Sequence, residues 1–356
     1  MLMLTRARTS AVVFDTGAAG LRAVQVEQRR GALRLIDRLC VEAPATQDLD
    51  PARLGRLLEQ GDFQGDDVAL CLSSRQFSFH VLRIPEKALE QPTEQVEELV
   101  ALETARETRT DPAEWETRWW RLATRGGPNV AVIAVKRAFL LQWDERFQAM
   151  GLTLRRVEVA PWGLVRLAAR QTVPDPQDAW GVLDLGHTHT TLTVVVGQTP
   201  SYVRALRLSG AALSQRLAQA YQLDPVEAQE LKHAHGIQAG DGGAVADPQS
   251  ALQNAAQLPL MNFNLLRESL DALVRETAAC FSFALQGDGE LQVRRLVLAG
   301  GGARLSGLRD WLELQLGLPI VELATDGAPW ELPVHGAVQP EEASAVGAAL
   351  LDLESE

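Results

Sequence analysis

The sequence of 356 residues has few cysteines, few basic residues and no long apolar run. Its three cysteines, Cys40, Cys71 and Cys280, are far apart and form no Cys-x-x-Cys pair. This pattern argues against a disulfide scaffold and a zinc ribbon, and it favours a reducing compartment, the cytoplasm. No stretch reaches about twenty apolar residues, so no transmembrane helix is expected. The opening MLMLTRARTS becomes polar too soon for a signal peptide.

Positive charge is scarce as well. The chain has 34 Lys and Arg against 46 Asp and Glu, which gives a formal net charge of -12. Nucleic-acid-binding proteins need clustered Lys and Arg to contact phosphates, and polybasic membrane-surface proteins need them to contact anionic lipids. The sequence therefore predicts neither a nucleic-acid partner nor direct insertion into a membrane. An acidic chain of this kind would have to bind an anionic ligand through local backbone geometry.

What the sequence does contain is an internal repeat. Residues 11–17 read AVVFDTG and residues 180–186 read WGVLDLG, so each is a short apolar run that ends in Asp-x-Gly. Alternating apolar and polar segments with turn residues follow each run, and helical patterns follow these at 51–60 and 211–221. The chain therefore contains two related β-β-β-α units, and we expect two lobes instead of one doubly wound sheet.

A different region separates the two units, and it is predicted to be a small α+β insertion of about seventy residues. Its pattern predicts an acidic helix, two strands, an amphipathic helix and a strand, at 86–106, 115–123, 130–135, 138–150 and 153–159. After the second unit, the pattern predicts a surface loop, a long helix, a strand and two further helices, at 236–259, 263–286, 294–298, 305–316 and 341–353.

Both Asp-x-Gly sequences follow a predicted strand and open a tight turn. Glycine lets the backbone approach a phosphate, and successive N–H groups then form a nest for an anion. Asp15 and Asp184 would repel phosphate, so they would instead face Mg²⁺ or its water ligands. A single Asp-x-Gly is more often an ordinary turn, but two copies in matching contexts favour a phosphate site.

A third glycine-rich element lies near the end of the second half. Residues 296–308 read LVLAGGGARLSGL, so a predicted strand runs into Gly300, Gly301 and Gly302 before a helix begins near Ser306. Glycines in such a position allow a flat base to lie against the backbone. An ordinary strand-to-helix turn is the alternative interpretation.

Together these motifs resemble those of the actin, sugar-kinase and Hsp70 ATPase superfamily. The first phosphate loop of that superfamily corresponds to 15–17, the second to 184–190 and the adenosine loop to 298–302. Within the superfamily the chain is most similar to the PilM family, the actin-like proteins of type IV pilus assembly, and more distantly to FtsA. The likeness covers nearly the whole chain, and RALRLSG, DPVEAQELK and VLAGGGARLSG also carry it.

The resemblance implies an α/β (α+β) fold, namely a duplicated actin/Hsp70-like ATPase fold with two lobes around a nucleotide cleft and a small inserted subdomain. The first lobe core would comprise 1–80 with 155–180 and 331–356, and the inserted subdomain would comprise 81–154. The second lobe core would comprise 181–210 with 287–330, and its helical subdomain would comprise 211–286.

The resemblance also implies that ATP and Mg²⁺ bind between the lobes, with Asp15 and Asp184 facing the metal. Asp184 would also take part in catalysis, and Glu158 would position the attacking water, although a solvated strand position is an equal alternative for Glu158. The implied nucleotide contacts are Asp15, Thr16, Gly17, Arg22, Gly186, Thr188, Thr190, Gln229, Lys232, Gly300, Gly301, Gly302 and Arg304.

Several positions depart from the family pattern. The first phosphate loop has Ala-Ala at 18–19 where relatives have Ser or Thr, and Arg22 replaces a lysine. Gln229 replaces an acidic ribose contact, and Ala-Cys at 279–280 replaces an Arg-Ser pair. Three lost polar contacts at about 1 kcal/mol each would weaken nucleotide binding about a hundredfold. We therefore expect at most a slow ATPase, and a degenerate site stays open as an interpretation.

The function that the resemblance implies is a cytoplasmic nucleotide-binding scaffold of a type IV pilus or a related envelope machine. It would bind the N-terminal cytoplasmic peptide of a PilN-like inner-membrane protein between the first lobe and the insertion, and it could form a homo-oligomer. Because the tail LLDLESE is acidic, this partner and not lipid would recruit the protein to the membrane. The alternatives are a nucleotide-free GspL-like secretion scaffold and a sugar-kinase-type enzyme, for which no catalytic Asp is apparent.

Overall fold

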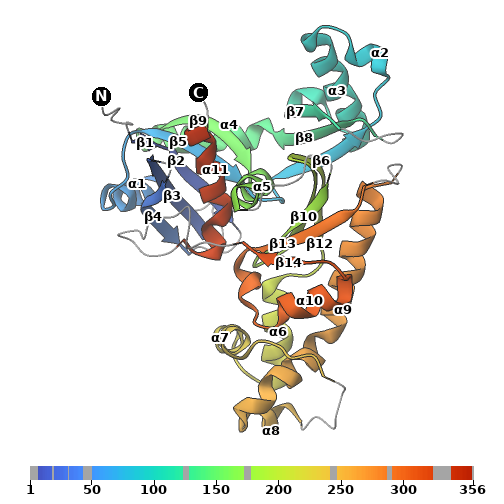
Figure 1. Cartoon of the computed structure of the whole chain (residues 1–356). Helices are drawn as coiled ribbons and strands as arrows, with labels where there is room; N and C mark the ends of the chain where they lie inside the picture. The colour runs from blue at the N-terminus through green and yellow to red at the C-terminus, as the bar shows by residue number, and fades with distance from the viewer. Residues whose placement is uncertain are drawn as a thin grey trace.

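The computed structural model describes residues 7–17, 20–30, 32–42, 50–122, 128–171, 178–240, 247–286, 291–323 and 338–354. Figure 1 shows a first lobe at the left, a second lobe at the lower right and a smaller inserted subdomain at the upper right. Each of these three parts is built around its own β-sheet.

The first lobe has a six-stranded sheet of order β1-β3-β2-β5-β9, with β4 paired to β3. Its strands are β1 (Arg8–Thr9), β2 (Val12–Gly17), β3 (Gly20–Arg29), β4 (Ala32–Val41), β5 (Asp67–Leu72) and β9 (Thr153–Val159). β2, β3 and β4 form an antiparallel meander, and β5 lies parallel to β2. The sheet is covered on both faces, which explains why β2 is apolar at consecutive positions.

Helices α1 (Pro51–Glu59) and α4 (Arg137–Ala149) cover one face of this sheet, and α5 (Ala160–Gln171) and α11 (Ala343–Glu354) cover the other. α5 and α11 approach closely where Gly163 and Gly347 meet, because a Cβ on either glycine would overlap the backbone of the other helix. The Ala-rich sequence of α11 is almost completely buried. The predicted acidic tail is thus a core helix of the first lobe.

The second lobe repeats this pattern. Its sheet has the order β12-β11-β10-β13-β14, in which β10, β11 and β12 form an antiparallel meander and β13 lies parallel to β10. The strands are β10 (Ala179–Leu185), β11 (Thr190–Val196), β12 (Thr199–Leu206), β13 (Val293–Ala299) and β14 (Ile320–Glu322). The helices are α6 (Gly210–Tyr221), α7 (Pro225–His235), α8 (Pro248–Leu252), α9 (Leu258–Ala284) and α10 (Leu308–Leu316). The predicted duplication is confirmed.

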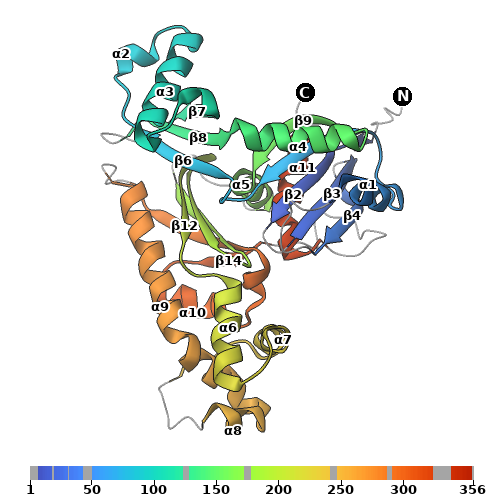
Figure 2. The same cartoon turned by 180° about the vertical axis from the view of Figure 1, so that it is seen from behind.

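The inserted subdomain has a three-stranded antiparallel sheet of order β6-β8-β7, formed by β6 (Phe77–Leu82), β7 (Trp115–Arg121) and β8 (Val130–Lys136). The single helix expected at 86–106 is two helices, α2 (Glu86–Leu89) and α3 (Thr93–Thr108), because Pro92 interrupts the pattern. Figure 2 shows β6 leading from the first lobe into this subdomain. The Trp120 indole N–H reaches the second lobe, where it donates to the carbonyl of Pro200 at 3.0 Å.

One predicted loop is partly wrong. The segment 236–259 contains α8 and a 3₁₀ turn at Ala255–Gln257, while 241–246 lie outside the described residues. The Asp247 side chain caps α8 by accepting from the Gln249 N–H at 2.9 Å, so Asp-Pro was an overlooked helix start. None of the helices in the described part of the chain combines the length and hydrophobicity that a membrane crossing requires.

Candidate functional site

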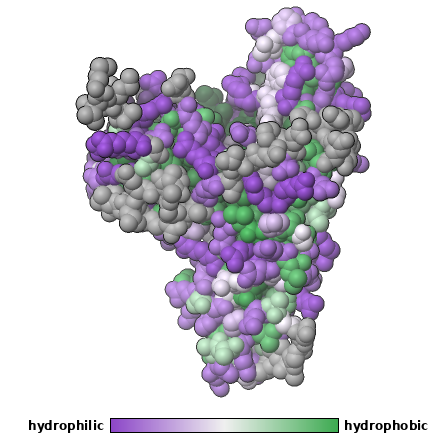
Figure 3. Space-filling view, viewed as in Figure 1, coloured by the Kyte–Doolittle hydropathy of each residue, from purple (hydrophilic) through white to green (hydrophobic). Residues whose placement is uncertain are grey.

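A cleft of about 550 Å³ opens between the two lobes. Its walls are the end of β2, the start of β3, the turns that follow β10 and β13, and the segment that leads into α11. On the face seen in Figure 3, hydrophilic residues predominate and hydrophobic ones form separate patches. Most of the predicted contacts line the cleft, namely Asp15, Gly17, Arg22, Asp184, Gly186, Thr188, Gln229, Lys232, Gly300, Gly301, Gly302 and Arg304.

The first carboxylate of the cleft is that of Asp15, near the end of β2, which is only 5% exposed. Burial raises its pKa, while the Arg22 guanidinium and a hydrogen bond from Ser344 oppose this rise. The Ser344 hydroxyl donates to Asp15 Oδ2 at 2.8 Å. Because Ser344 lies in α11, the C-terminal helix fixes the orientation of this carboxylate.

The second carboxylate, that of Asp184 in β10, has a different setting. Burial and the nearby Asp15 carboxylate raise its pKa to about 7, and Arg22 opposes this rise. Gly300 packs directly against it with φ +77°, and a Cβ at that position would overlap the Asp184 carboxylate and the Leu185 backbone. Only glycine fits there without displacing the second Asp-x-Gly turn.

The positive charge of Arg22 lowers the pKa of both Asp15 and Asp184. It lies on β3 directly opposite Asp15 in the antiparallel pairing with β2. Within the described residues, its guanidinium makes no hydrogen bond or ion pair. An anionic ligand in the cleft would therefore find a charged donor that is not already engaged.

The second turn is fixed by backbone hydrogen bonds. The Gly210 N–H donates to the Gly186 carbonyl at 3.0 Å, and the Ala211 N–H donates to the His187 carbonyl at 2.8 Å. Burial and nearby cations lower the pKa values of His187 and His189, so the surroundings of both imidazoles favour the neutral form. The described ranges contain no group of three His, Cys, Asp or Glu side chains that could hold a metal ion.

Lys232 lies in α7 at the second-lobe wall of the cleft and is only 3% exposed. Its ammonium donates to the Gly210 carbonyl at 3.1 Å and to Ser214 Oγ at 3.0 Å. Burial lowers its pKa to about 8. Lys232 therefore ties α7 to the start of α6, and Gln229 lies one turn before it on the cleft wall.

The 3₁₀ turn η5 (Pro340–Glu342) carries residues of the cleft that the sequence motifs did not indicate. Glu341 pairs with Arg304 of the second lobe at 3.1 Å, and Glu342 pairs with Arg38 of the first lobe at 3.4 Å. This turn thus contacts both lobes. No sequence motif includes these residues. They are far from the Asp-x-Gly and glycine-rich motifs in sequence, although they line the same cleft.

Three predicted site residues do not line the cleft. The Thr16 hydroxyl lies within hydrogen-bond distance of Gln76 Oε1, at 2.8 Å. Thr190 is completely buried, and its hydroxyl has no partner within the described residues. Neither threonine is therefore placed to contact a phosphate in this structure.

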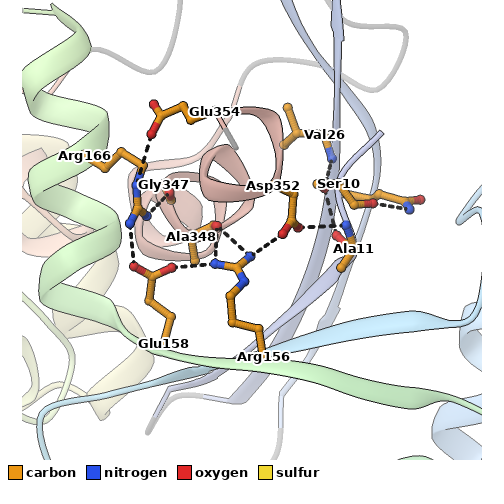
Figure 4. A network of polar contacts seen from close by, with 11 residues as sticks. Ser10, Ala11, Val26, Arg156, Glu158, Arg166, Gly347, Ala348, Asp352 and Glu354 are labelled. Carbon is orange, nitrogen blue, oxygen red and sulfur yellow. Dashed lines mark hydrogen bonds and ion pairs between the residues drawn. The ribbon is translucent and has the colours of Figure 1, made fainter. Parts of the chain in front are cut away.

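Glu158 is the third. Figure 4 shows its carboxylate between two arginines, beside α11. Arg156 donates to it at 2.7 Å and Arg166 donates to it at 2.8 Å. Arg156 also pairs with Asp352 of α11 at 3.1 Å, so these ion pairs fasten α11 to β9 and α5. This position corresponds to a structural ion-pair network and not to a residue that faces water in the cleft.

Two duplicated meander lobes around a cleft with paired aspartates define an actin-like ATPase fold. No model of a known protein family matches the sequence. Among solved structures, the chain is similar to one from the "PilM-PilN type IV pilus biogenesis complex", with a TM-score of 0.73 and 22% identity over 98% of this chain and 100% of that chain. The predicted fold class is thereby confirmed.

Two further solved structures are more distant. The ethanolamine utilization protein EutJ from Carboxydothermus hydrogenoformans matches with a TM-score of 0.49 and 13% identity, over 97% of this chain and 89% of that chain. MreB5 of Spiroplasma citri bound to AMPPNP matches with a TM-score of 0.47 and 12% identity, over 98% and 96%. Since one fold hosts many functions, the function has to be argued from the cleft.

Proposed function

We propose that this protein is a nucleotide-binding scaffold of a type IV pilus assembly machine or a related envelope machine. The observation that carries the proposal is the cleft between the lobes, where Asp15, Asp184 and Arg22 converge. The fold supports it, because the likeness to a chain of the PilM–PilN complex extends over the full length of that chain.

The cleft has the size and polarity that a nucleotide requires. A volume of about 550 Å³ lies within the usual range for small-molecule sites. The backbone at Gly300–Gly302 would bear the base, and Gly17, Gly186 and Arg22 would face the phosphates. Mg²⁺ in nucleotide sites is bound by one or two carboxylates together with phosphates and water, so Asp15 and Asp184 suffice. Bound Mg²⁺ would neutralise phosphate charge.

Other contacts point to weak binding. The Glu341 carboxylate lies against the glycine turn, since a Cβ at Gly301 would be 3.0 Å from Glu341 Oε1. Together with the ion pair to Arg304, this acidic side chain occupies one side of the surface where adenosine would bind. A nucleotide-free GspL-like scaffold with the same fold is therefore the second candidate, and this contact favours it.

The partner would be the N-terminal cytoplasmic peptide of a PilN-like inner-membrane protein, bound between the first lobe and the inserted subdomain. This protein would then be located in the cytoplasm and held at the inner membrane by that partner. α11 supports recruitment through a protein, because its apolar residues already fill the first-lobe core and are not available to lipid.

Isothermal titration calorimetry with ATP and ADP, each with Mg²⁺ or with EDTA, tests the nucleotide part of the proposal. We expect dissociation constants in the micromolar to sub-millimolar range, and weaker binding without Mg²⁺. Absence of heat at millimolar nucleotide would reject ATP binding and favour the nucleotide-free scaffold. Rapid ATP hydrolysis stimulated by a sugar would instead point to the sugar-kinase alternative.

A fluorescence polarisation assay tests the partner. The probe is a labelled peptide with the N-terminal cytoplasmic sequence of a PilN-like inner-membrane protein, and the control is the same peptide in scrambled order. We expect saturable binding of the native peptide alone. Equal binding of both peptides, or of neither, would reject the pilus scaffold whatever the nucleotide result.

A further inference from the structure

A pair of hydroxyl groups joins the two lobes inside the cleft. Ser74 lies in the turn between β5 and β6 of the first lobe, and Thr191 lies in β11 of the second lobe. Their oxygens are 2.7 Å apart, and both residues line the cleft. Thr191 is paired with Asp184 in the β10–β11 register, so the two side chains project from the same face of the sheet. The hydroxyl pair therefore lies next to the second carboxylate.

The chemistry of this pair leaves one donor unused. Each hydroxyl has one proton, and the bond between Ser74 and Thr191 consumes only one of the two. Within the described residues, neither hydroxyl makes a second hydrogen bond. The remaining proton is thus available to an acceptor in the cleft, and a phosphate oxygen is an acceptor that fits the position beside Asp184.

The turn that presents Ser74 is held in place by Gln76. Gln76 Oε1 accepts from the Ser73 N–H at 2.7 Å and also lies 2.8 Å from the Thr16 hydroxyl, so the turn is attached to the end of β2. Arg75, which lies between Ser74 and Gln76 in the sequence, places positive charge near His189 of the second turn. A fixed turn with a hydroxyl and a cation is suited to an anion.

This arrangement accounts for a departure in the sequence. The first phosphate loop has Ala-Ala at 18–19 and so lacks hydroxyl groups. Ser73 and Ser74 bring hydroxyl groups into the cleft from a different turn of the same lobe. We infer that the Ser74–Thr191 pair contacts the terminal phosphate of a nucleoside triphosphate and gives the cleft its preference for ATP over ADP. This inference rests on the proposed nucleotide site.

Calorimetric affinities for ATP and for ADP test the inference in Ser74→Ala and Thr191→Val. Because each hydroxyl fixes the direction of the other through their 2.7 Å hydrogen bond, loss of either leaves the remaining O–H without a fixed orientation toward the phosphate. We therefore expect each variant to bind ATP about tenfold more weakly, while ADP affinity changes less than about twofold. Thr191→Ser keeps the hydroxyl and should retain the wild-type ratio of the two affinities. Ser78→Ala, in β6, removes a hydroxyl that does not line the cleft and serves as the matched control.

The possible results separate the inference from the proposed function. If the wild type binds neither nucleotide, the inference and the nucleotide part of the proposed function are both rejected. If the wild type binds both but Ser74→Ala and Thr191→Val weaken ATP and ADP equally, or weaken neither, the inference alone is overturned. Thermal unfolding of each variant shows that it is folded, and a loss of ATP affinity counts only when the ADP affinity is retained.

Discussion

The two Asp-x-Gly turns begin from the same sequence pattern and end in different surroundings. In the first lobe, the turn at Asp15 is accompanied by Arg22, whose guanidinium has no ion-pair partner among the residues that the structure describes, and is fixed through Ser344 of α11. In the second lobe, the turn at Asp184 has two histidines, hydroxyl groups and the closely packed Gly300. The duplicated units have thus diverged, so that the first contributes charge and the second contributes shape and neutral donors.

The comparison also shows that the two buried carboxylates have different hydrogen-bond partners. Ser344 donates to the Asp15 carboxylate, which stabilises its charged form, whereas within the described residues the Asp184 side chain accepts no hydrogen bond. Asp184 therefore experiences burial and its neighbour's charge without compensation from a donor. The Asp-x-Gly motif thus places a carboxylate at the end of a strand, and the residues packed around it influence its pKa.

The largest expected effect concerns the shape of the second turn. Gly300→Ala should lower the free energy of unfolding by about 3 kcal/mol, because a strained φ adds to the overlap with Asp184 and Leu185. Gly65→Ala is the matched control, since Gly65 has φ +78° but no atom within 4 Å of the added Cβ. It should cost about 1 kcal/mol. Equal shifts of the urea midpoint for the two variants would show that packing against Asp184 is unimportant.

The effect of pH on stability should be smaller for each pH unit, and it tests the Asp184 carboxylate. The pKa of Asp184 is raised to about 7 in the folded protein, so between pH 4 and 7 the native state binds more protons than the unfolded state. Stability from this group therefore falls as the pH rises, by at most about 1.4 kcal/mol per pH unit. Asp184→Asn should gain stability over the wild type as the pH increases to 7. A difference that is constant from pH 4 to pH 8 would contradict this origin.

The smallest expected effect concerns the electrostatic attraction between Arg22 of the first lobe and Asp184 of the second lobe. Arg22→Gln should destabilise the protein by about 1 kcal/mol at pH 8, and the loss should shrink when Asp184→Asn is also present. Arg22→Lys keeps the charge and provides the control. At pH 5, where Asp184 is protonated, the coupling should disappear. A coupling energy of zero at pH 8, from a double-mutant cycle in urea, would show that Arg22 does not act across the lobes.

Much of the fold could be predicted from the sequence, because its signals are local. The alternating patterns after each Asp-x-Gly predict the two meanders, and the glycines at Gly300–Gly302 indicate a turn that does lie in the cleft. Pro92 and Asp247 also carry local signals, a helix break and a helix cap, which the hydrophobic periodicity alone does not reveal. The residue limits of the predicted subdomains stay predictions.

The remainder of the site depends on contacts between distant segments. Ser344 is 329 residues from Asp15, and Ser74 is 117 residues from Thr191, so no periodicity or motif connects them. Glu158 illustrates the opposite error. The family resemblance suggested that it positions the attacking water, but Arg156 and Arg166 engage its carboxylate in ion pairs beside α11. Sequence pattern gives the strand on which a residue lies, whereas its partners depend on tertiary packing.

The position of α11 has a consequence for how the protein is made. The helix fills the centre of the first-lobe core, yet its residues follow those of β2 by more than three hundred positions. During synthesis on a ribosome, the first lobe cannot complete its core until the entire second lobe has emerged. Until then, the first-lobe sheet would keep an exposed apolar face. Chaperones that bind such surfaces should therefore associate with nascent chains that lack this helix.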